Sequence, residues 1–122
     1  MSGLRLLLVE DEAIIALLLE RILKGLGISV LGPIGQLTEA LDIARSQQFD
    51  GAILDVSVRG GQIYPVADLL LERGIPFVLT TGHSAEQLPA NLRTQRLLRK
   101  PYSTEQFTAA LECFERPPRA GP

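Results

Sequence analysis

Runs rich in apolar residues recur five times along the chain, and blocks with apolar residues at helical spacing separate them. A short continuous apolar run is typical of a strand that is covered on both faces of a sheet. We therefore predict strands at 4–10, 28–33, 51–56, 75–82 and 96–101. The second run reads ISVLGP, and we expect its Gly-Pro pair to end that strand.

The blocks between these runs carry apolar residues three and four positions apart, which is the period of one helix face. In the first block this period is followed by Ile15, Leu18, Leu19, Ile22 and Leu26. We predict helices at 12–27, 37–49, 63–74 and 103–115. Ser103 and Gln106 have the spacing of a capping box, which supports a helix that begins at this point.

The block at 84–95, between the fourth and fifth predicted strands, is short for a helix. Pro89 interrupts it, because proline removes a backbone donor and restricts the residue before it. Leu88 and Leu92 are the main apolar residues that could hold it against a core. We therefore expect residues 83–95 to be the most mobile part of the fold.

Strands that alternate with helices throughout the chain argue for an α/β fold with a parallel sheet. Its crossovers should be right-handed, with helices on both faces of the sheet. No linker or repeat divides the sequence, so we expect one domain at residues 1–115. The tail RPPRAGP, residues 116–122, is rich in proline and glycine and is expected to be disordered.

The composition narrows the class of protein. Of the 122 residues, 46% are hydrophobic and 21% are charged, as in a globular domain. A net charge of −2 offers no basic excess for nucleic acid, and a single cysteine excludes an intrachain disulfide framework. No apolar run approaches the roughly 18 residues of a membrane helix, and the N-terminus lacks a signal-peptide pattern. We therefore expect a cytoplasmic protein with neither a nucleic-acid nor a membrane partner.

Residues that can carry chemistry stand where four of the predicted strands end. They are Glu10 and Asp11 after the first strand, Asp55 after the third, Thr80 and Thr81 at the fourth, and Lys100 at the fifth. In an open parallel sheet these strand ends meet at one edge, where ligands bind. Clustered carboxylates become tolerable around a hard cation, and Mg²⁺ takes oxygen ligands. A carboxylate can also attack phosphorus, and a lysine then offsets the charge on the phosphoryl oxygens.

Each of these residues has an ordinary structural explanation when it is taken alone. Acids before a helix are often favoured by the helix dipole, and an aspartate after a strand often forms an Asx-turn. A lysine before a turn is commonly a surface residue. The joint pattern, with the residues in order and each at a strand end, favours a functional site.

With these residues in place, the sequence resembles the receiver domain of two-component response regulators over about residues 4–115. The segments that carry the resemblance are VEDE, AILDV and KPY. The resemblance implies a flavodoxin-like (βα)5 fold with a doubly wound five-stranded parallel sheet in the order 2-1-3-4-5. The segment PFVLTTGH resembles the PFxFATGY signature of a receiver subgroup that is often paired with HWE-type histidine kinases.

The resemblance also implies a function for the acidic residues. Asp55 would accept a phosphoryl group from a sensor histidine kinase or a phosphotransfer protein, and the phosphorylated chain would signal by protein–protein interaction. Asp11 and Asp55 would bind Mg²⁺ directly, with the backbone carbonyl of Ser57 as a third ligand. Glu10 would act on the metal through a water molecule.

Two further residues complete the implied site, and two others depart from the family pattern. Thr81 would hydrogen-bond a phosphoryl oxygen, and Lys100 would pair with the same group. Arg59 stands where most receivers carry a proline, and Leu97 stands where many carry an aromatic switch residue. The usual coupled threonine–aromatic switch is therefore in doubt. His83 replaces the tyrosine of the signature, and we assign it no catalytic role.

Three functional hypotheses remain after this reasoning. The first is a stand-alone receiver, which is not an enzyme toward a separate substrate but assists its own phosphorylation and dephosphorylation. The second is a Mg²⁺-dependent phosphatase or phosphotransferase of the haloacid-dehalogenase type, although Ser57 stands where that class places a second acid. The third is a pseudo-receiver that never takes phosphate. The cognate kinase, the target, the oligomeric state and a possible origin in a hybrid kinase are not readable from the sequence.

Overall fold

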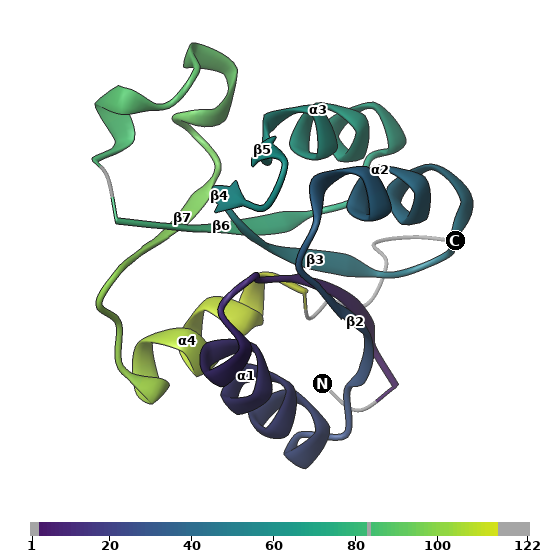
Figure 1. The fold of residues 1–122 in the computed structure, drawn as a ribbon. Coiled ribbons are helices and arrows are strands. Elements are labelled where there is room, and N and C mark those ends of the chain that lie inside the picture. Colours follow the sequence, from purple (N-terminus) through teal and green to yellow (C-terminus); the bar gives the residue numbers. More distant parts are fainter. Residues whose placement is uncertain (1–2, 83, 115–122) are drawn as a thin grey trace, which may run out of the picture.

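The centre of the molecule is a five-stranded sheet in the order β2-β1-β3-β6-β7 (Figure 1). The strands are β1 (Arg5–Val9), β2 (Ser29–Ile34), β3 (Gly51–Asp55), β6 (Phe77–Thr81) and β7 (Arg96–Arg99). All four pairings are parallel. Counted among these five strands alone, the order is 2-1-3-4-5, so the predicted sheet is confirmed.

The computed structural model describes residues 3–82 and 84–114. The expectations for His83 and for the tail at 116–122 lie outside the described residues. None of the helices in the described part of the chain is long and apolar enough to cross a membrane.

Helices cover both faces of the sheet, as predicted, because strand side chains alternate between the two faces. The helices are α1 (Ala13–Gly25), α2 (Leu37–Ser46), α3 (Tyr64–Arg73) and α4 (Thr104–Ala110). Leu6 and Leu8 of β1 pack in one cluster with Leu19 of α1 and Phe107 of α4. Leu7, between them, packs in the other cluster, to which α2 and α3 contribute. In Figure 1 the two helix pairs lie on opposite sides of the sheet.

The α4 helix begins with the capping box that its sequence predicts. The hydroxyl of Ser103 accepts a hydrogen bond from the backbone N–H of Gln106 at 3.0 Å. The Gln106 side chain accepts one in return from the N–H of Ser103 at 2.7 Å. Two of the helix's otherwise unpaired donors are thereby satisfied. A 3₁₀ helix, η3 (Leu111–Phe114), continues α4 toward the end of the described chain.

The prediction that Gly-Pro ends β2 is wrong. The strand continues through Gly32 and Pro33 to Ile34, and its register against β1 shifts by one residue at this point. Such a bulge on an edge strand tolerates proline, which cannot donate to the ladder. Gly32 has a φ of 115°, and a Cβ at this position would lie 2.7 Å from the carbonyl oxygen of Leu8. The bulge therefore requires glycine.

The fourth helix of a complete (βα)5 fold is replaced, in the described residues, by two 3₁₀ helices. They are η1 (Ala85–Gln87) and η2 (Ala90–Leu92), and Pro89 lies between them. Leu88 is only 3% exposed and Leu92 only 1%, and both belong to the core cluster beneath α2 and α3. Two leucines thus hold this segment to the core. The mobility expected for it stays a prediction.

A short hairpin after β3 was predicted only as a loop. It consists of β4 (Ser57–Val58) and β5 (Gly61–Gln62), which pair antiparallel. Gly60 and Gly61 have φ angles of 97° and 140°, a region that side chains rarely adopt. The glycine pair therefore allows the chain to reverse directly after the acidic end of β3.

The packing of β3 against the end of the described chain yields a stability prediction. A Cβ on Gly51 would overlap the ring of Phe114 and lie 3.2 Å from Leu6. We expect Gly51→Ala to lower the free energy of unfolding by about 1–3 kcal/mol, the usual cost of overpacking a core. Urea denaturation measures this. Gly25→Ala is the matched control, because no heavy atom lies within 4 Å of the Cβ position there. Equal effects of the two substitutions would contradict the packing.

Candidate functional site

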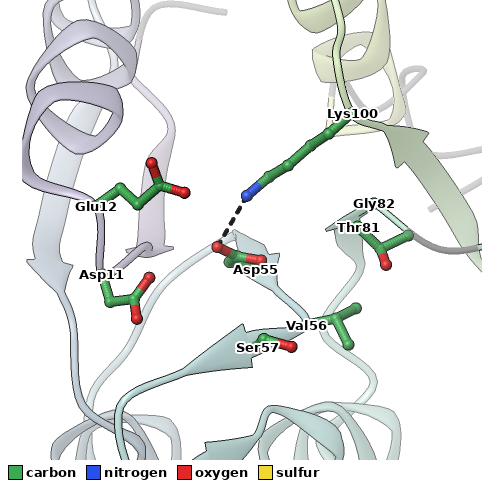
Figure 2. Close-up of a pocket in the computed structure, with 8 residues that line it drawn as sticks. All are labelled: Asp11, Glu12, Asp55, Val56, Ser57, Thr81, Gly82 and Lys100. Carbon is green, nitrogen blue, oxygen red and sulfur yellow. Dashed lines mark hydrogen bonds and ion pairs between the residues drawn. The ribbon is translucent and has the colours of Figure 1, made fainter.

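The candidate site lies at the carboxyl ends of the strands, where β1 and β3 are neighbours. The chain leaves β1 toward β2 on one side and later enters β3 on the other, so this is the switch point of the sheet. A cavity of about 330 Å³ opens here (Figure 2). Its lining residues are Asp11, Glu12, Asp55, Val56, Ser57, Thr81, Gly82 and Lys100. All the candidate residues named from the sequence except Glu10 and Thr80 therefore line this one cavity.

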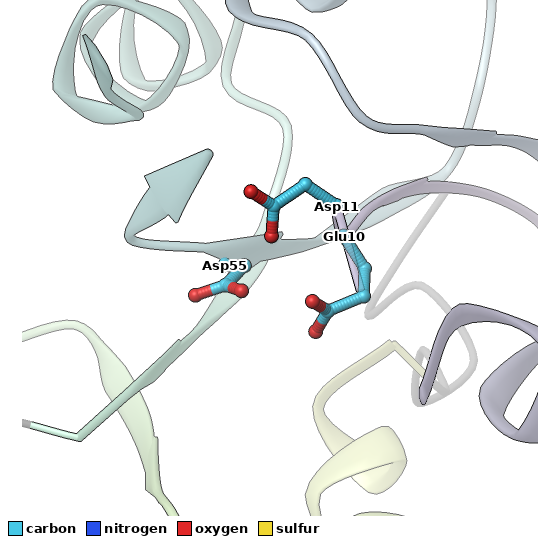
Figure 3. Close-up of side chains that lie close together, drawn as sticks. All are labelled: Glu10, Asp11 and Asp55. Atoms are coloured by element: carbon cyan, nitrogen blue, oxygen red, sulfur yellow. The ribbon is translucent and has the colours of Figure 1, made fainter. Parts of the chain in front are cut away.

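Glu10 is not part of this lining, but it completes an acidic triad with Asp11 and Asp55 (Figure 3). One carboxylate oxygen from each of the three residues lies within 4.8 Å of the other two. Glu10 is 3% exposed and Asp55 is 5% exposed. Buried carboxylates at this separation repel one another strongly, so the fold has to supply compensation.

Lys100 supplies the positive charge nearest to the triad. Its Nζ donates a hydrogen bond to Oδ2 of Asp55 at 3.0 Å and lies 3.8 Å from Oε1 of Glu10 (Figure 2). Burial lowers the pKa of Lys100, but the hydrogen bond and the charges of these two acids outweigh it and leave the pKa raised. The lysine is therefore a permanent cation in this site.

The surroundings of Glu10 shift the pKa of its carboxyl group. Burial and the nearby charge of Asp55 raise its pKa to about 7, although the N–H of Glu12 and the charge of Lys100 act in the opposite direction. Its Oε2 accepts a hydrogen bond from the backbone N–H of Glu12 at 3.1 Å. Its Oε1 is buried and has no hydrogen-bond partner among the residues that the structure describes. Near neutral pH this carboxyl group is thus poised between its two protonation states.

The hydroxyl-bearing residues come from β6 and β4. Thr80 and Thr81, the last residues of β6, are both buried, but only Thr81 belongs to the lining of the cavity. Ser57 is the first residue of β4, two positions after Asp55, and it lies on the opposite wall from Lys100 in Figure 2. Of the two threonines, Thr81 is therefore the one placed to contact a ligand in the cavity.

Arg59 and Leu97, the two departures from the family pattern, lie in different parts of the structure. The backbone of Arg59 bridges two loops, since its carbonyl accepts from the N–H of Leu37 at 2.8 Å and its N–H donates to Gly35 at 3.2 Å. A Cβ on Gly35 would meet the end of the Arg59 side chain, so the guanidinium would have to shift to make room for it. Leu97 in β7 is half-buried and packs against the core cluster beneath α2 and α3.

Sequence reasoning missed two residues near the site. Glu12 contributes both its side chain to the cavity and its N–H to Glu10. Tyr102 follows the Lys100–Pro101 pair and is affected by the charges of the site, because burial and then the negative charge of Glu10 raise the pKa of its phenol. The signal for Tyr102 was its place directly after KP in the sequence.

The donor set of the triad fits a hard divalent cation. Mg²⁺ and Ca²⁺ take oxygen ligands, whereas Zn²⁺ sites commonly include histidine or cysteine. Three carboxylates gather within reach of one ion, and Oε1 of Glu10 still lacks a hydrogen-bond donor among the described residues. The acidic cluster could therefore bind a metal.

The chain was also compared with protein families, curated proteins and solved structures. No family model matches the chain. The chain is similar in structure to SdrG of Sphingomonas melonis Fr1, with 38% identity, a TM-score of 0.78, and coverage of 93% of this chain and 98% of SdrG. A BeF3-activated conformation of SdrG, from Pseudomonas melonis Fr1, is also 38% identical, with a TM-score of 0.73 and coverage of 92% and 97%.

Two curated relatives are longer than this chain. It is 30% identical over 112 residues to the transcriptional regulatory protein PdtaR of Mycobacterium tuberculosis. The matched residues cover 88% of this chain and 55% of PdtaR. It is 31% identical over 110 residues to the phyllosphere-induced regulator PhyR of Methylorubrum extorquens, covering 87% of this chain and 41% of PhyR. The chain thus spans about half the length of the curated relatives it matches. The response regulator REC domain of PhyR from Erythrobacter litoralis shares the fold, with 22% identity, a TM-score of 0.79, and coverage of 99% of this chain and 98% of that domain.

The raised pKa of Glu10 predicts how stability depends on pH when no divalent cation is present. The ordinary pKa of this carboxyl is 4.5, and the folded value is about 7. Between these values the folded state binds more protons, so the free energy of unfolding falls as pH rises. Full deprotonation costs up to about 3 kcal/mol. Urea denaturation in EDTA from pH 4.5 to 8 measures this fall.

Glu10→Gln should remove this part of the pH dependence, because the amide cannot ionise. Glu39→Gln, which changes an exposed acid of α2, is the control and should keep the slope of the wild type. Identical slopes for Glu10→Gln and the wild type would show that Glu10 is not the titrating group.

Proposed function

Because the chain belongs to the family of response regulator receiver domains, we propose that it is a phospho-acceptor module of a two-component phosphorelay. Asp55 takes the phosphoryl group from a sensor histidine kinase or a phosphotransfer protein. The observation that carries this proposal is the position of Asp55. It is buried at the end of β3, hydrogen-bonded to Lys100 at 3.0 Å, and close to the two other acids of the triad.

The side chains of the cavity divide the work of phosphoryl transfer. A carboxylate oxygen of Asp55 forms the new bond to phosphorus, while the bond from phosphorus to the imidazole nitrogen of the donor breaks. Lys100 already reaches Oδ2 of Asp55 and offsets negative charge on the transferred oxygens. Thr81 lines the same cavity from β6, where its hydroxyl donates a hydrogen bond to a phosphoryl oxygen.

The acidic triad provides the metal site in this proposal. Asp11 and Asp55 would hold Mg²⁺ directly together with the backbone carbonyl of Ser57, and Glu10 would act through a water. When bound, Mg²⁺ neutralises charge on the phosphoryl oxygens. The triad's hard oxygen donors and their mutual distance support this assignment.

The surface beside the site supports signalling through a protein partner. Three apolar side chains of α1 are exposed: Ile14 by 85%, Leu17 by 50% and Leu18 by 53%. Exposed apolar residues gathered on one helix are typical of a protein-binding surface. The PFVLTTGH segment supports a histidine kinase of the HWE type as the donor. We further propose that this module is cytoplasmic and has no nucleic-acid or membrane partner. It is no enzyme toward a separate substrate.

Phosphorylation of Asp55 is the direct test of the function. Incubation with acetyl phosphate and Mg²⁺ should add the mass of one phosphoryl group, and omission of Mg²⁺ should prevent it. Asp55→Asn should abolish the increment, because an amide oxygen is a poor nucleophile. Asp42→Asn, which changes an exposed acid of α2, is the control and should leave the mass increment intact. Intact-mass spectrometry measures each sample. A pseudo-receiver would show no increment, and an increment that persists in Asp55→Asn would refute the assignment.

Two acids of the triad should contribute unequally to Mg²⁺ affinity. A direct ligand contributes more than a group that acts through a water, so Asp11→Ala should raise the Kd about 100-fold and Glu10→Ala about tenfold. Isothermal titration calorimetry measures both, with exposed Glu39→Ala as the control. Equal losses, or an unchanged Kd for Asp11→Ala, would contradict the proposed geometry.

A further inference from the structure

Two buried side-chain oxygens lack a hydrogen-bond partner among the residues that the structure describes. They are Oε1 of Glu10 and the hydroxyl oxygen of Tyr102. A buried polar group without a partner destabilises the folded state, and native structures contain few of them. One of the two atoms can only accept a hydrogen bond when ionised, and the other is a donor. The pair is therefore chemically complementary.

Lys100 lies close to Glu10 in space and close to Tyr102 along the chain. Lys100 lies 3.8 Å from Oε1 of Glu10, and Tyr102 follows it by two residues. Burial raises the pKa of the phenol, the charges of Glu10 and Asp55 raise it further, and the charge of Lys100 lowers it. The hydroxyl thus lies within the electrostatic field of Glu10 and Lys100.

The ring of Tyr102 is held by apolar contacts, which leaves the hydroxyl as its polar end. The ring stacks on Phe107, with centroids 6.1 Å apart and planes 21° apart. It also lines a groove of about 460 Å³ together with Ile15, Leu18 and Pro101. Packing alone would be served equally well by phenylalanine. The hydroxyl therefore needs a separate explanation.

We propose that the Tyr102 hydroxyl is the positioning group of Glu10. It donates a hydrogen bond to one buried water that in turn donates to Oε1, while the N–H of Glu12 holds Oε2. With both oxygens fixed, the carboxylate keeps one orientation toward Asp11 and Asp55. The effect on Mg²⁺ rests on the proposed function, whereas the hydrogen bond itself does not.

A double-mutant cycle in EDTA tests the hydrogen bond without metal or phosphoryl donor. Tyr102→Phe removes only the hydroxyl, so it should lower the equilibrium constant for folding about fivefold. In the Glu10→Ala background the same change should cause less than about a twofold loss, since the acceptor is absent. Tyr64→Phe, at the start of α3, is the control and should behave alike in both backgrounds. Urea denaturation measures all variants.

The signs of the results separate the proposal from simple packing. If the hydroxyl had no partner, Tyr102→Phe would relieve a buried unpaired group and would stabilise both backgrounds equally. Such an additive cycle would overturn the inference. The cycle is measured without Mg²⁺ and without acetyl phosphate. Its result on the Tyr102 hydrogen bond therefore holds even if Asp55 proves not to accept phosphate.

The affinity for Mg²⁺ distinguishes a positioning role of Tyr102 from a merely structural one, because a purely structural residue would leave the Kd unchanged. Tyr102→Phe should raise the Kd about three- to tenfold by calorimetry, and it should have no effect when Glu10 is already alanine. An unchanged Kd in the otherwise wild-type chain would overturn the positioning role. Phosphorylation of Tyr102→Phe at saturating Mg²⁺ should still occur on Asp55, which keeps this test distinct from that of the proposed function.

Discussion

The interaction on which the site depends is the ion pair between Lys100 and Asp55, because it makes a buried acidic cluster tolerable. Two carboxylates about 4 Å apart repel by roughly 4 kcal/mol at an effective dielectric near 20. Lys100 contacts Asp55 at 3.0 Å and lies near Glu10 at 3.8 Å, so one cation faces two buried acids. Without it, the burial of both carboxylates would oppose folding. The acidic ends of β1 and β3 therefore require the basic end of β7.

The sheet brings these residues together only while its register holds. The acids follow β1 and end β3, and the lysine follows β7, beyond the intervening β6. Side chains alternate between two core clusters, so a slip of one residue would turn Leu6, Leu7 and Leu8 toward the wrong faces. The apolar core thus fixes the register, and the register fixes the distance between Lys100 and Asp55. Residues that never touch the cavity determine its geometry.

The fold was predictable where local pattern and global packing agree. Apolar runs gave the five strands and their polar ends, because a buried strand has to be apolar along its length. The path of β2 through Gly32 and Pro33 was not predictable, since a bulge on an edge strand overrides the usual breaker signal. The close approach of the Arg59 side chain to Gly35 also escaped prediction, because it joins two loops that are distant in sequence. Long-range contacts of this kind leave no local pattern.

Protons and divalent cations should compete for the negative charge of the acidic triad. The three carboxylates of the triad gather beside the ammonium group of Lys100, and their combined charge attracts further positive charge. Glu10 can meet part of that demand with a proton, since burial raises its pKa to about 7. A divalent cation would meet the same demand and would favour the ionised carboxylate, so each of the two ligands weakens the binding of the other. The depth at which the fold buries Glu10 therefore sets how strongly protons compete for this site.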